Sequence, residues 1–301
     1  MAPEDTTDIE FKFIESEELA KVDYIVDQQY EQLKKEDHQI WRELYDRQMK
    51  ILKHRAAPNF FNNMNELEIA KEGIPNYNHL SDFLKEKTGW TLVPVPGLIP
   101  GKYFFQHLAE KRFPVTNWIR SRNQMDYIVE PDAFHDVYAH VPMIAQQDFS
   151  DYLQHYGIEA LKALKISEQK GVDVLERLAR VYWFTVEFGL INTKDGLRIY
   201  GAGIQSSKTE SIYSLESNIP TRIDFELERV ARTQYDFSNL QKNYFPVNSY
   251  EDLLYETRSS ALEEMYKKII ENQQDYTHET HLSSDKIIQP NPVVNPKQHF
   301  Y

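Results

Sequence analysis

A mainly α-helical single domain with a few short strands is the fold class that the sequence predicts. Glycine and proline are scarce, at 10 and 14 of 301 residues, which disfavours a loop-rich β-sheet protein. Apolar residues recur at three- and four-residue steps in stretches that lack both. No internal repeat or long linker divides the chain. We therefore expect one domain at residues 35–270, preceded by an arm and a helix start at 1–34 and followed by a polar tail at 271–301.

The individual elements follow from periodicity and from end signals. Across residues 16–55 helix-forming residues dominate, and an apolar stripe that includes Trp41 and Leu44 indicates an amphipathic helix. The proline-rich segment 92–101 predicts an extended loop, and 197–203 predicts a short strand with a turn. Other helices are expected at about 65–71, 79–87, 103–112, 149–164, 173–188 and 249–272.

Composition excludes several classes of function. The chain has 34 Lys and Arg against 47 Asp and Glu, a net charge of −13, which argues against nucleic acid or an anionic membrane as the main partner. No stretch reaches the roughly 18 apolar residues of a membrane helix. The absence of cysteine rules out disulfides, thiolate metal sites and cysteine nucleophiles. It also fits a reducing compartment, so we expect a cytoplasmic protein.

Two histidines stand five residues apart among apolar neighbours, at His135 and His140. In a regular α-helix a step of five rotates the side chains by about 140°, which points the rings apart. Both can reach one metal ion only across a helix end or a widened π-type turn. Asp132 can cap a helix that begins at Ala133, and Pro142 interrupts it, so such irregularity fits the sequence. Taken alone, ordinary core or surface histidines remain the simpler explanation.

Glu187 lies in the most apolar expected helix of the chain. An unpaired ionised carboxylate in such a helix is very costly. It must therefore be protonated, paired with a base such as Arg120 or Arg180, or bound to a cation. Trp183 precedes Glu187 by one helical turn, so its indole would line any cavity beside the carboxylate, although core packing is its simplest role.

Together, His135, His140 and Glu187 make up a candidate 2-His-1-carboxylate set. Such a facial triad leaves positions open on Fe(II) and is the usual signature of non-haem iron oxygenases. Because the chain has no thiolate, nitrogen and oxygen ligands are the only option. A zinc ion with an open position uses the same ligand types, so the residues alone leave the metal undecided.

Two longer segments make the sequence recognisable. Residues 131–142 are Pro-Asp-Ala-Phe-His-Asp-Val-Tyr-Ala-His-Val-Pro, and residues 179–190 are Ala-Arg-Val-Tyr-Trp-Phe-Thr-Val-Glu-Phe-Gly-Leu. Both resemble the iron-site signature of the pterin-dependent aromatic amino acid hydroxylases. The likeness covers roughly residues 35–270, and the His-Asp pair at 135–136 is most similar to bacterial members that hydroxylate phenylalanine. Supporting segments follow in matching order and spacing at 97–104, 117–120, 127–132 and 200–207.

The resemblance implies a monooxygenase that converts L-phenylalanine to L-tyrosine with Fe(II), O2 and tetrahydrobiopterin or a related tetrahydropterin. The iron ligands, which are also the catalytic residues, would be His135, His140 and Glu187. The pterin would bind at Gly97, Leu98, Ile99, Phe104, Asp136 and Tyr182. The amino acid would contact Arg120, Ile128, Pro131, Asp132, Trp183, Phe188 and Ser206. The planar fork of Arg120 would suit the substrate carboxylate.

Two positions depart from the family pattern. Ala139 stands where the family usually has glycine, directly before the second histidine, and its methyl group restricts the backbone more than glycine does. Ile128 replaces a threonine that is common in the animal enzymes at a substrate-carboxylate position. Both changes bear on substrate preference more than on iron binding.

Three alternatives stay open at this stage. The same chemistry could act on L-tryptophan or at another ring position. A second class is a metal-dependent hydrolase that uses His135 and Asp136 as a metal dyad, with His107 as an upstream ligand. A third class is a helical interaction protein whose histidines are only structural, which predicts no bound iron.

The animal members of the family add an N-terminal regulatory domain and a C-terminal helix that forms tetramers. Here the motifs begin near residue 97, and the tail lacks a heptad pattern. We therefore expect a monomer without feedback through a regulatory domain. Its partners would be the small-molecule amino acid and the pterin, with no nucleic acid and no membrane.

Overall fold

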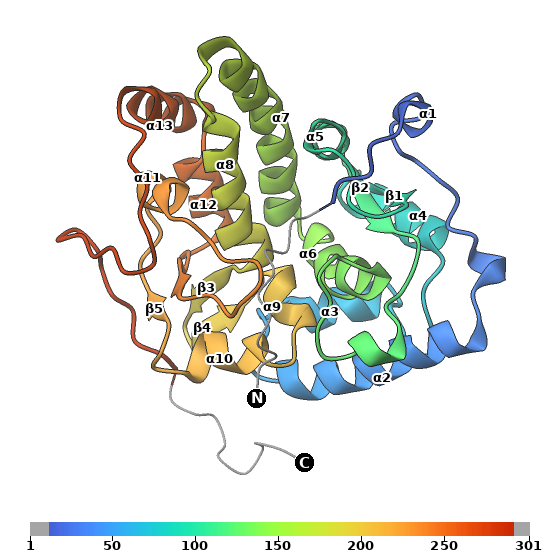
Figure 1. Cartoon of the computed structure of the whole chain (residues 1–301). Helices are drawn as coiled ribbons and strands as arrows, with labels where there is room; N and C mark the ends of the chain where they lie inside the picture. Colours follow the sequence, from blue (N-terminus) through green and yellow to red (C-terminus); the bar gives the residue numbers. More distant parts are fainter. Residues whose placement is uncertain (1–11, 292–301) are drawn as a thin grey trace.

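The computed structural model describes residues 12–291 and confirms a mainly helical protein (Figure 1). The α-helices are α1 Glu17–Ala20, α2 Lys35–Leu52, α3 Phe60–Glu66, α4 Tyr77–Lys87, α5 Gly101–Ala109, α6 Val141–Ile144, α7 Gln147–Lys170, α8 Val174–Tyr182, α9 Ala202–Ser206, α10 Glu210–Glu216, α11 Leu227–Arg232, α12 Tyr250–Glu256 and α13 Ser259–Glu271. The 3-10 turns are η1 Tyr30–Gln32 and η2 Arg122–Gln124, and the π-helices are η3 Phe134–His140 and η4 Trp183–Glu187.

The strands are short and pair only two by two within residues 12–291. β1 and β2 run parallel, with Leu92 opposite Phe113, while β3 and β4 form an antiparallel hairpin. β5 and β6 are a parallel pair of two residues each. Their bounds are β1 Thr91–Val95, β2 Arg112–Thr116, β3 Leu190–Thr193, β4 Gly196–Ile199, β5 Thr221–Arg222 and β6 Asn243–Tyr244.

A large hydrophobic core runs through the described part of the chain, from Ile40 in α2 to Ile269 in α13. Its centre includes the aromatic side chains of Trp41, Phe134 and Tyr138, each fully buried. Helices α7 and α8 stand side by side above this core, and α2 lies across the opposite end of the molecule (Figure 1). The π-helices η3 and η4 both contact α9, so the sequence-predicted metal ligands meet inside the helical framework.

The described part of the N-terminal arm packs on the loop after β1. Tyr24 is buried in a small apolar cluster with Val95 and Ile99. The Ile14 N–H donates to the Leu98 carbonyl at 2.8 Å. The arm therefore covers one side of the loop to which the resemblance assigns the pterin. Residues 1–11 lie outside the described residues, and so does most of the loose arm expected at 1–15.

Two expected helices are interrupted. The long helix expected across residues 16–55 is divided into α1, η1 and α2, because Asp23, Tyr24 and Gln29 have positive φ angles of 52°, 62° and 54° that no α-helix accepts. The helix expected at 249–272 is divided into α12 and α13. Ser249 caps α12 as its side chain predicted, but the chain leaves the helical conformation at Arg258, where ψ is 152°.

Two further segments differ from expectation. The prediction of a helix at 65–71 is wrong. Helix α3 ends at Glu66, and Glu68 has a φ of 52°, which does not fit an α-helix. The segment 92–101, expected as a loop, begins with strand β1. Pro94 is tolerated there because β1 pairs with β2 alone, so its missing N–H breaks no second ladder.

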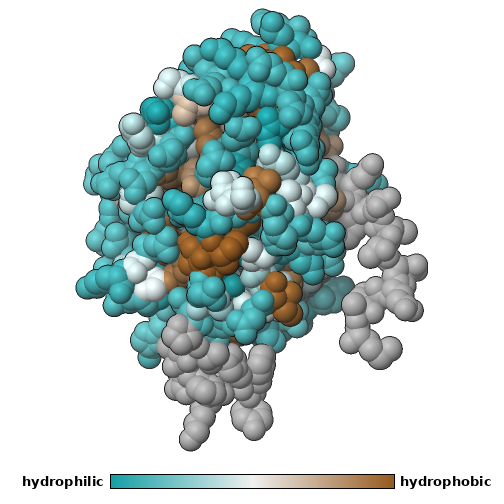
Figure 2. Space-filling view, turned by 90° about the vertical axis from the view of Figure 1, so that its left-hand side faces the viewer, coloured by the Kyte–Doolittle hydropathy of each residue, from teal (hydrophilic) through white to brown (hydrophobic). Residues whose placement is uncertain are grey.

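The surface seen in Figure 2 is mostly hydrophilic, with separate apolar areas. No helix within residues 12–291 combines the length and the apolar character that a membrane crossing requires.

Candidate active site

Two π-helices carry the three candidate metal ligands. His135 and His140 both lie in η3, and Glu187 is the last residue of η4. In a π-helix the backbone bonds span five residues, so a step of five returns to the same side of the helix. The Phe188 N–H donates to the Trp183 carbonyl at 2.8 Å and closes η4 with that same step. Because η3 holds both histidines, it confirms the widened turn that was one of the two arrangements expected from their spacing.

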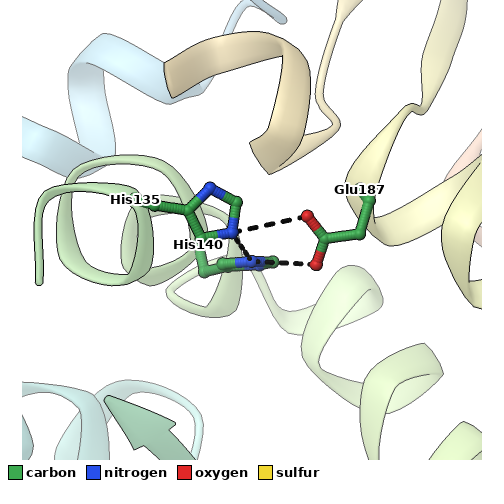
Figure 3. Close-up of side chains that lie close together, drawn as sticks. All are labelled: His135, His140 and Glu187. Carbon is green, nitrogen blue, oxygen red and sulfur yellow. Dashed lines mark hydrogen bonds and ion pairs between the residues drawn. The ribbon is translucent and has the colours of Figure 1, made fainter. Parts of the chain in front are cut away.

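The three side chains point at one another (Figure 3). The Nε2 atoms of His135 and His140 are 3.0 Å apart. His135 Nε2 lies 3.4 Å from one carboxylate oxygen of Glu187, and His140 Nε2 lies 3.2 Å from the other. Within residues 12–291 these three residues are the group whose ligand atoms gather closely enough for one metal ion, all within 4.8 Å of one another.

This spacing fits a metal ion of octahedral type. Two nitrogen ligands bound at about 2.1 Å and at right angles are separated by about 3.0 Å, which is the separation of the two Nε2 atoms here. Two imidazole lone pairs at that distance repel each other unless a proton or a cation lies between them. The two nitrogens and the carboxylate therefore make a donor set that suits a divalent cation.

Ser206 fixes the orientation of the first imidazole. Its Oγ lies 2.9 Å from His135 Nδ1 and donates its own proton to the Ala202 carbonyl at 2.9 Å. The hydroxyl must therefore accept from His135, which places the ring proton on Nδ1 and leaves the Nε2 lone pair free. This is the supporting hydrogen bond that metal-binding histidines usually have. Ser206, expected at the substrate, thus also contacts a metal ligand.

The charge of Glu187 is held by the two imidazoles. Burial alone would raise its pKa, but the adjacent His140 and His135 lower the pKa well below its ordinary value of 4.5. Burial lowers the pKa of His135, and the facing Glu187 carboxylate outweighs this effect and raises it. The site therefore presents an ionised carboxylate to whatever positive charge lies between these groups.

Arg120 and Asp132 form a buried bidentate pair beside η3. Arg120 Nε and Nη2 each donate to an Asp132 carboxylate oxygen at 2.8 Å, and the pair is 4% and 0% exposed. Asp132 also accepts from the His135 N–H at 3.0 Å, so it caps the start of η3 as expected. Arg120 lowers the pKa of Asp132 despite its burial. Asp132 thus orients the Arg120 side chain and also binds the backbone N–H of His135.

Three aromatic rings gather beside Glu187. Trp183 stacks on Phe188 with ring centroids 4.8 Å apart and on Tyr235 with centroids 4.3 Å apart. Its indole N–H donates to Gln241 Oε1 at 3.1 Å. Trp183 is partly exposed and packs against the hydrophobic core, so part of its indole remains accessible. Tyr235 and Gln241 were missed by sequence reasoning, because they lie some fifty residues away and belong to no motif.

The residues expected at the pterin lie close together. Phe104 packs edge-on against Tyr182, with centroids 5.8 Å apart, and also contacts the cluster that holds Ile99. The N–H groups of Leu98 and Ile99 donate to no acceptor within residues 12–291. Gly97 has a φ of 152°, a backbone conformation that L side chains rarely adopt. A half-buried aromatic ring beside free backbone donors suits a flat heterocycle with polar edges.

Asp136 points away from the ligand set, toward β2. Its Oδ2 accepts from the Thr116 N–H at 2.7 Å, and burial raises its pKa. Ala139 is fully buried in η3 without a positive φ, so its methyl group is accommodated. Ile128 is partly buried in the loop before η3, close in sequence to the half-buried Pro131.

The geometry does not support the hydrolase alternative. His107 is fully buried in α5, and its Nε2 contacts the Asp23 carbonyl at 2.8 Å. It is absent from the metal-ligand group found among residues 12–291. Glu187, which a His-Asp dyad leaves unexplained, is instead the third member of that group.

The fold and the site together define the class of this protein. It is a helical enzyme with a non-haem metal site made of two histidines and one carboxylate. A family model described as biopterin-dependent aromatic amino acid hydroxylase matches residues 3–291. The chain belongs to that family.

Known relatives are similar in sequence to this chain over most of its length. It is 46% identical over 236 residues to a phenylalanine-4-hydroxylase of Ralstonia nicotianae, covering 78% of this chain and 74% of the relative. It is 47% identical over 234 residues to one of Caulobacter vibrioides, covering 78% of each. A crystal structure of phenylalanine hydroxylase from Chromobacterium violaceum with bound iron(III) and oxidised cofactor 7,8-dihydrobiopterin superposes with a TM-score of 0.81 at 41% identity, covering 88% of this chain and 93% of that one.

Proposed function

We propose that this enzyme hydroxylates the aromatic ring of L-phenylalanine to give L-tyrosine, using Fe(II), a tetrahydropterin and O2. The observation that carries the proposal is the meeting of His135, His140 and Glu187 within 4.8 Å on two π-helices. Its support is that phenylalanine-4-hydroxylases are relatives across three quarters of the chain. The alternative is the same reaction on tryptophan, and the assay below must distinguish the two substrates.

His135, His140 and Glu187 are the residues that would hold the iron. When bound, Fe(II) together with the reduced pterin supplies the activation of O2 that ring hydroxylation requires. Glu187 brings negative charge to the site, while Ser206 keeps the His135 Nε2 lone pair directed at it. With three protein ligands, the iron would keep coordination positions open for small molecules.

The substrate would lie between Arg120 and the aromatic wall. Arg120 is positioned by Asp132 through Nε and Nη2, and its remaining Nη1 donates to no acceptor among residues 12–291. That group can therefore receive a carboxylate. Trp183 and Phe188 offer stacked apolar surface beside Glu187, which suits a benzene ring and excludes water.

The pterin would lie against the 97–99 backbone with Phe104 at its ring. The free N–H groups of Leu98 and Ile99 would serve its polar edge, and Tyr182 would close the site behind Phe104. Asp136 would lie near the cofactor while it anchors β2 through Thr116. These assignments follow the family pattern and agree with the packing around Phe104.

An assay with Fe(II), tetrahydropterin and O2 tests the proposal, with phenylalanine, tryptophan and tyrosine offered in parallel. Product chromatography should show tyrosine from phenylalanine as the main product, dependent on added pterin. Hydroxytryptophan as the main product would assign the same chemistry to another substrate. No pterin-dependent hydroxylation of any of the three would refute the proposal.

We also propose that the enzyme acts in the cytoplasm as a monomer with small-molecule partners only. The lack of cysteine and the net charge of −13 support this. Fractionation of the source cells with an antibody to the chain tests the location.

A further inference from the structure

A hydrogen-bonded chain leads from Trp183 into the protein interior. The indole N–H of Trp183 donates to Gln241 Oε1 at 3.1 Å. Gln241 is 2% exposed, and its side-chain Nε2 donates to the carbonyls of Asp236 and Asn239. Every hydrogen-bonding group of this amide is therefore engaged, so Gln241 has one orientation in which its oxygen faces the indole.

Glu210 holds the backbone of Gln241. One carboxylate oxygen of Glu210 accepts from the Gln241 N–H at 3.1 Å and from the Tyr244 hydroxyl. Glu210 is 4% exposed and forms no ion pair among residues 12–291. A buried carboxyl without a cationic partner is costly to keep. The hydrogen bonds from Gln241 and Tyr244 offset part of this cost.

Glu210 lies between two elements of the site, which it contacts through its backbone on one side and its carboxyl group on the other. The Glu210 N–H donates to Ser207 Oγ at 3.2 Å, and Ser207 directly follows Ser206, the partner of His135. On its other side Glu210 binds the segment that carries Gln241. Helices α9 and α10 are packed together, so the orientation of the indole and that of the first metal ligand share one support.

We propose that Gln241 and Glu210 are positioning residues that fix the Trp183 indole and thereby set the affinity and the choice of aromatic ring. The inference rests on the proposed function, in which Trp183 lines the amino-acid pocket. Gln241 holds the edge of the indole, Tyr235 stacks on it, and Glu210 holds Gln241. An indole free to rotate would present a different shape to the substrate ring.

The test compares Gln241→Leu with the wild type. Leucine keeps the approximate size but removes the amide, so Trp183 loses its acceptor. We expect the KM for phenylalanine to rise about 3- to 10-fold, the range that one neutral hydrogen bond supplies. The ratio of phenylalanine to tryptophan hydroxylation should fall by a similar factor, while iron content and the KM for pterin stay at wild-type values. Gln234→Leu, an exposed substitution on the same segment, is the matched control.

Glu210 offers a second pair of variants. Glu210→Gln keeps an oxygen that accepts from Gln241 and Tyr244, so it should retain the wild-type KM. Glu210→Ala removes that acceptor and should show the same KM rise as Gln241→Leu. A KM rise in both Glu210 variants, or in neither, would overturn the role given to this residue.

A spectroscopic readout keeps the inference testable without turnover. The indole N–H resonance of Trp183, assigned by its loss in Trp183→Phe, should move in Gln241→Leu and Glu210→Ala but not in Gln234→Leu. If the wild type hydroxylates phenylalanine but Gln241→Leu leaves both the Trp183 resonance and the substrate ratio unchanged, the inference is overturned and the proposed function stands. Loss of all hydroxylation in the wild type would instead refute the proposed function.

Discussion

Arg120 divides its guanidinium group between a buried partner and the substrate pocket. Nε and Nη2 are bound to Asp132 at 2.8 Å, which leaves Nη1 for another acceptor. The resemblance marked both residues for the substrate, but their mutual pairing was not predictable from sequence. The eleven residues between them have no regular period that brings the two side chains together. By contrast, His135, His140 and Glu187 were predictable as a set, because together they match a 2-His-1-carboxylate site and both of their segments resemble the iron-site signature of the family.

Substitution at these residues should separate iron binding from substrate binding. Arg120→Lys keeps the charge but loses the planar fork, so the KM for phenylalanine should rise about 10- to 100-fold with iron retained. Glu187→Ala removes the carboxylate ligand and should lose the iron. Elemental analysis and steady-state kinetics measure both effects. An Arg120→Lys enzyme with wild-type KM would contradict the carboxylate role of Arg120.

Glu210 makes stability depend on pH in an unusual direction. Burial raises its pKa from an ordinary 4.5 to about 7, although hydrogen bonds from Tyr244 and Gln241 oppose the rise. The folded state therefore binds the proton more tightly than the unfolded state. This contribution to stability is present at low pH and is lost as pH rises through about 7.

Glu210→Gln removes this titration and keeps the side-chain shape. The wild type loses the contribution of Glu210 as the pH rises from 5 to 8, and the variant does not. The unfolding free energy of the variant minus that of the wild type should therefore be about 2–3 kcal/mol larger at pH 8 than at pH 5. Urea unfolding of both proteins at the two pH values gives the difference, in which all other titrating groups cancel. A difference that does not change with pH would show that Glu210 titrates normally.

At the scale of elements, the two π-helices are what make the ligand spacing work. Sequence reasoning identified the need for a widened turn at His135 but not the second one in η4, because nothing in the Trp183–Glu187 segment departs from a buried α-helix pattern. The breaks at Asp23 and Arg258 were missed for a related reason. Helix-forming residues surround them, and tertiary packing overrides local preference there.

Helices α5 and α7 are in close contact at Gly157. A Cβ atom there would lie 2.5 Å from the Ala109 backbone nitrogen and 2.7 Å from Leu108 Cβ. Helix α5 also carries Phe104, so the close approach helps to place the proposed pterin site. The backbone at Ala109 cannot move aside as the end of a flexible side chain could.

Gly157→Ala should therefore destabilise the fold by about 1–3 kcal/mol, as overpacking does in close-packed interiors. Denaturant unfolding monitored by circular dichroism measures the change. Ile158→Ala, at the neighbouring residue that is 41% exposed, is the control and should stay within about 0.5 kcal/mol of the wild type. Equal effects of the two substitutions would show that the helices can separate at little cost.

At the scale of the whole molecule, both flanking segments pack on the catalytic elements, the N-terminal one through a small separate apolar cluster and the C-terminal one against the large core. Tyr24 packs under Val95, and the Ile288 N–H donates to the Arg222 carbonyl at 2.8 Å. The proposed division at residues 35 and 270 describes where the family motifs lie. The packing of the flanks on the core could not be predicted, because their polar composition gives no periodic signal.

The intact protein should sediment as a single 35.6 kDa species. Its net charge of −13 favours mutual repulsion between copies. Large apolar residues exposed within 12–291, such as Val22, Ile219 and Tyr255, are distributed over separate elements. Sedimentation equilibrium at several concentrations and at low salt measures the mass. A tetramer would contradict the monomer proposal.

The hydrogen bond from Ile14 to Leu98 and the buried ring of Tyr24 have a practical consequence for protein engineering. A chain trimmed to begin at residue 35 would keep each metal ligand and each substrate contact named here. It would nevertheless expose the inner side of the 97–99 loop and leave Val95 and Ile99 without their covering ring. Motif boundaries and folding boundaries therefore differ in this enzyme, and a fusion partner or sensor is better joined ahead of residue 12 than in place of the arm.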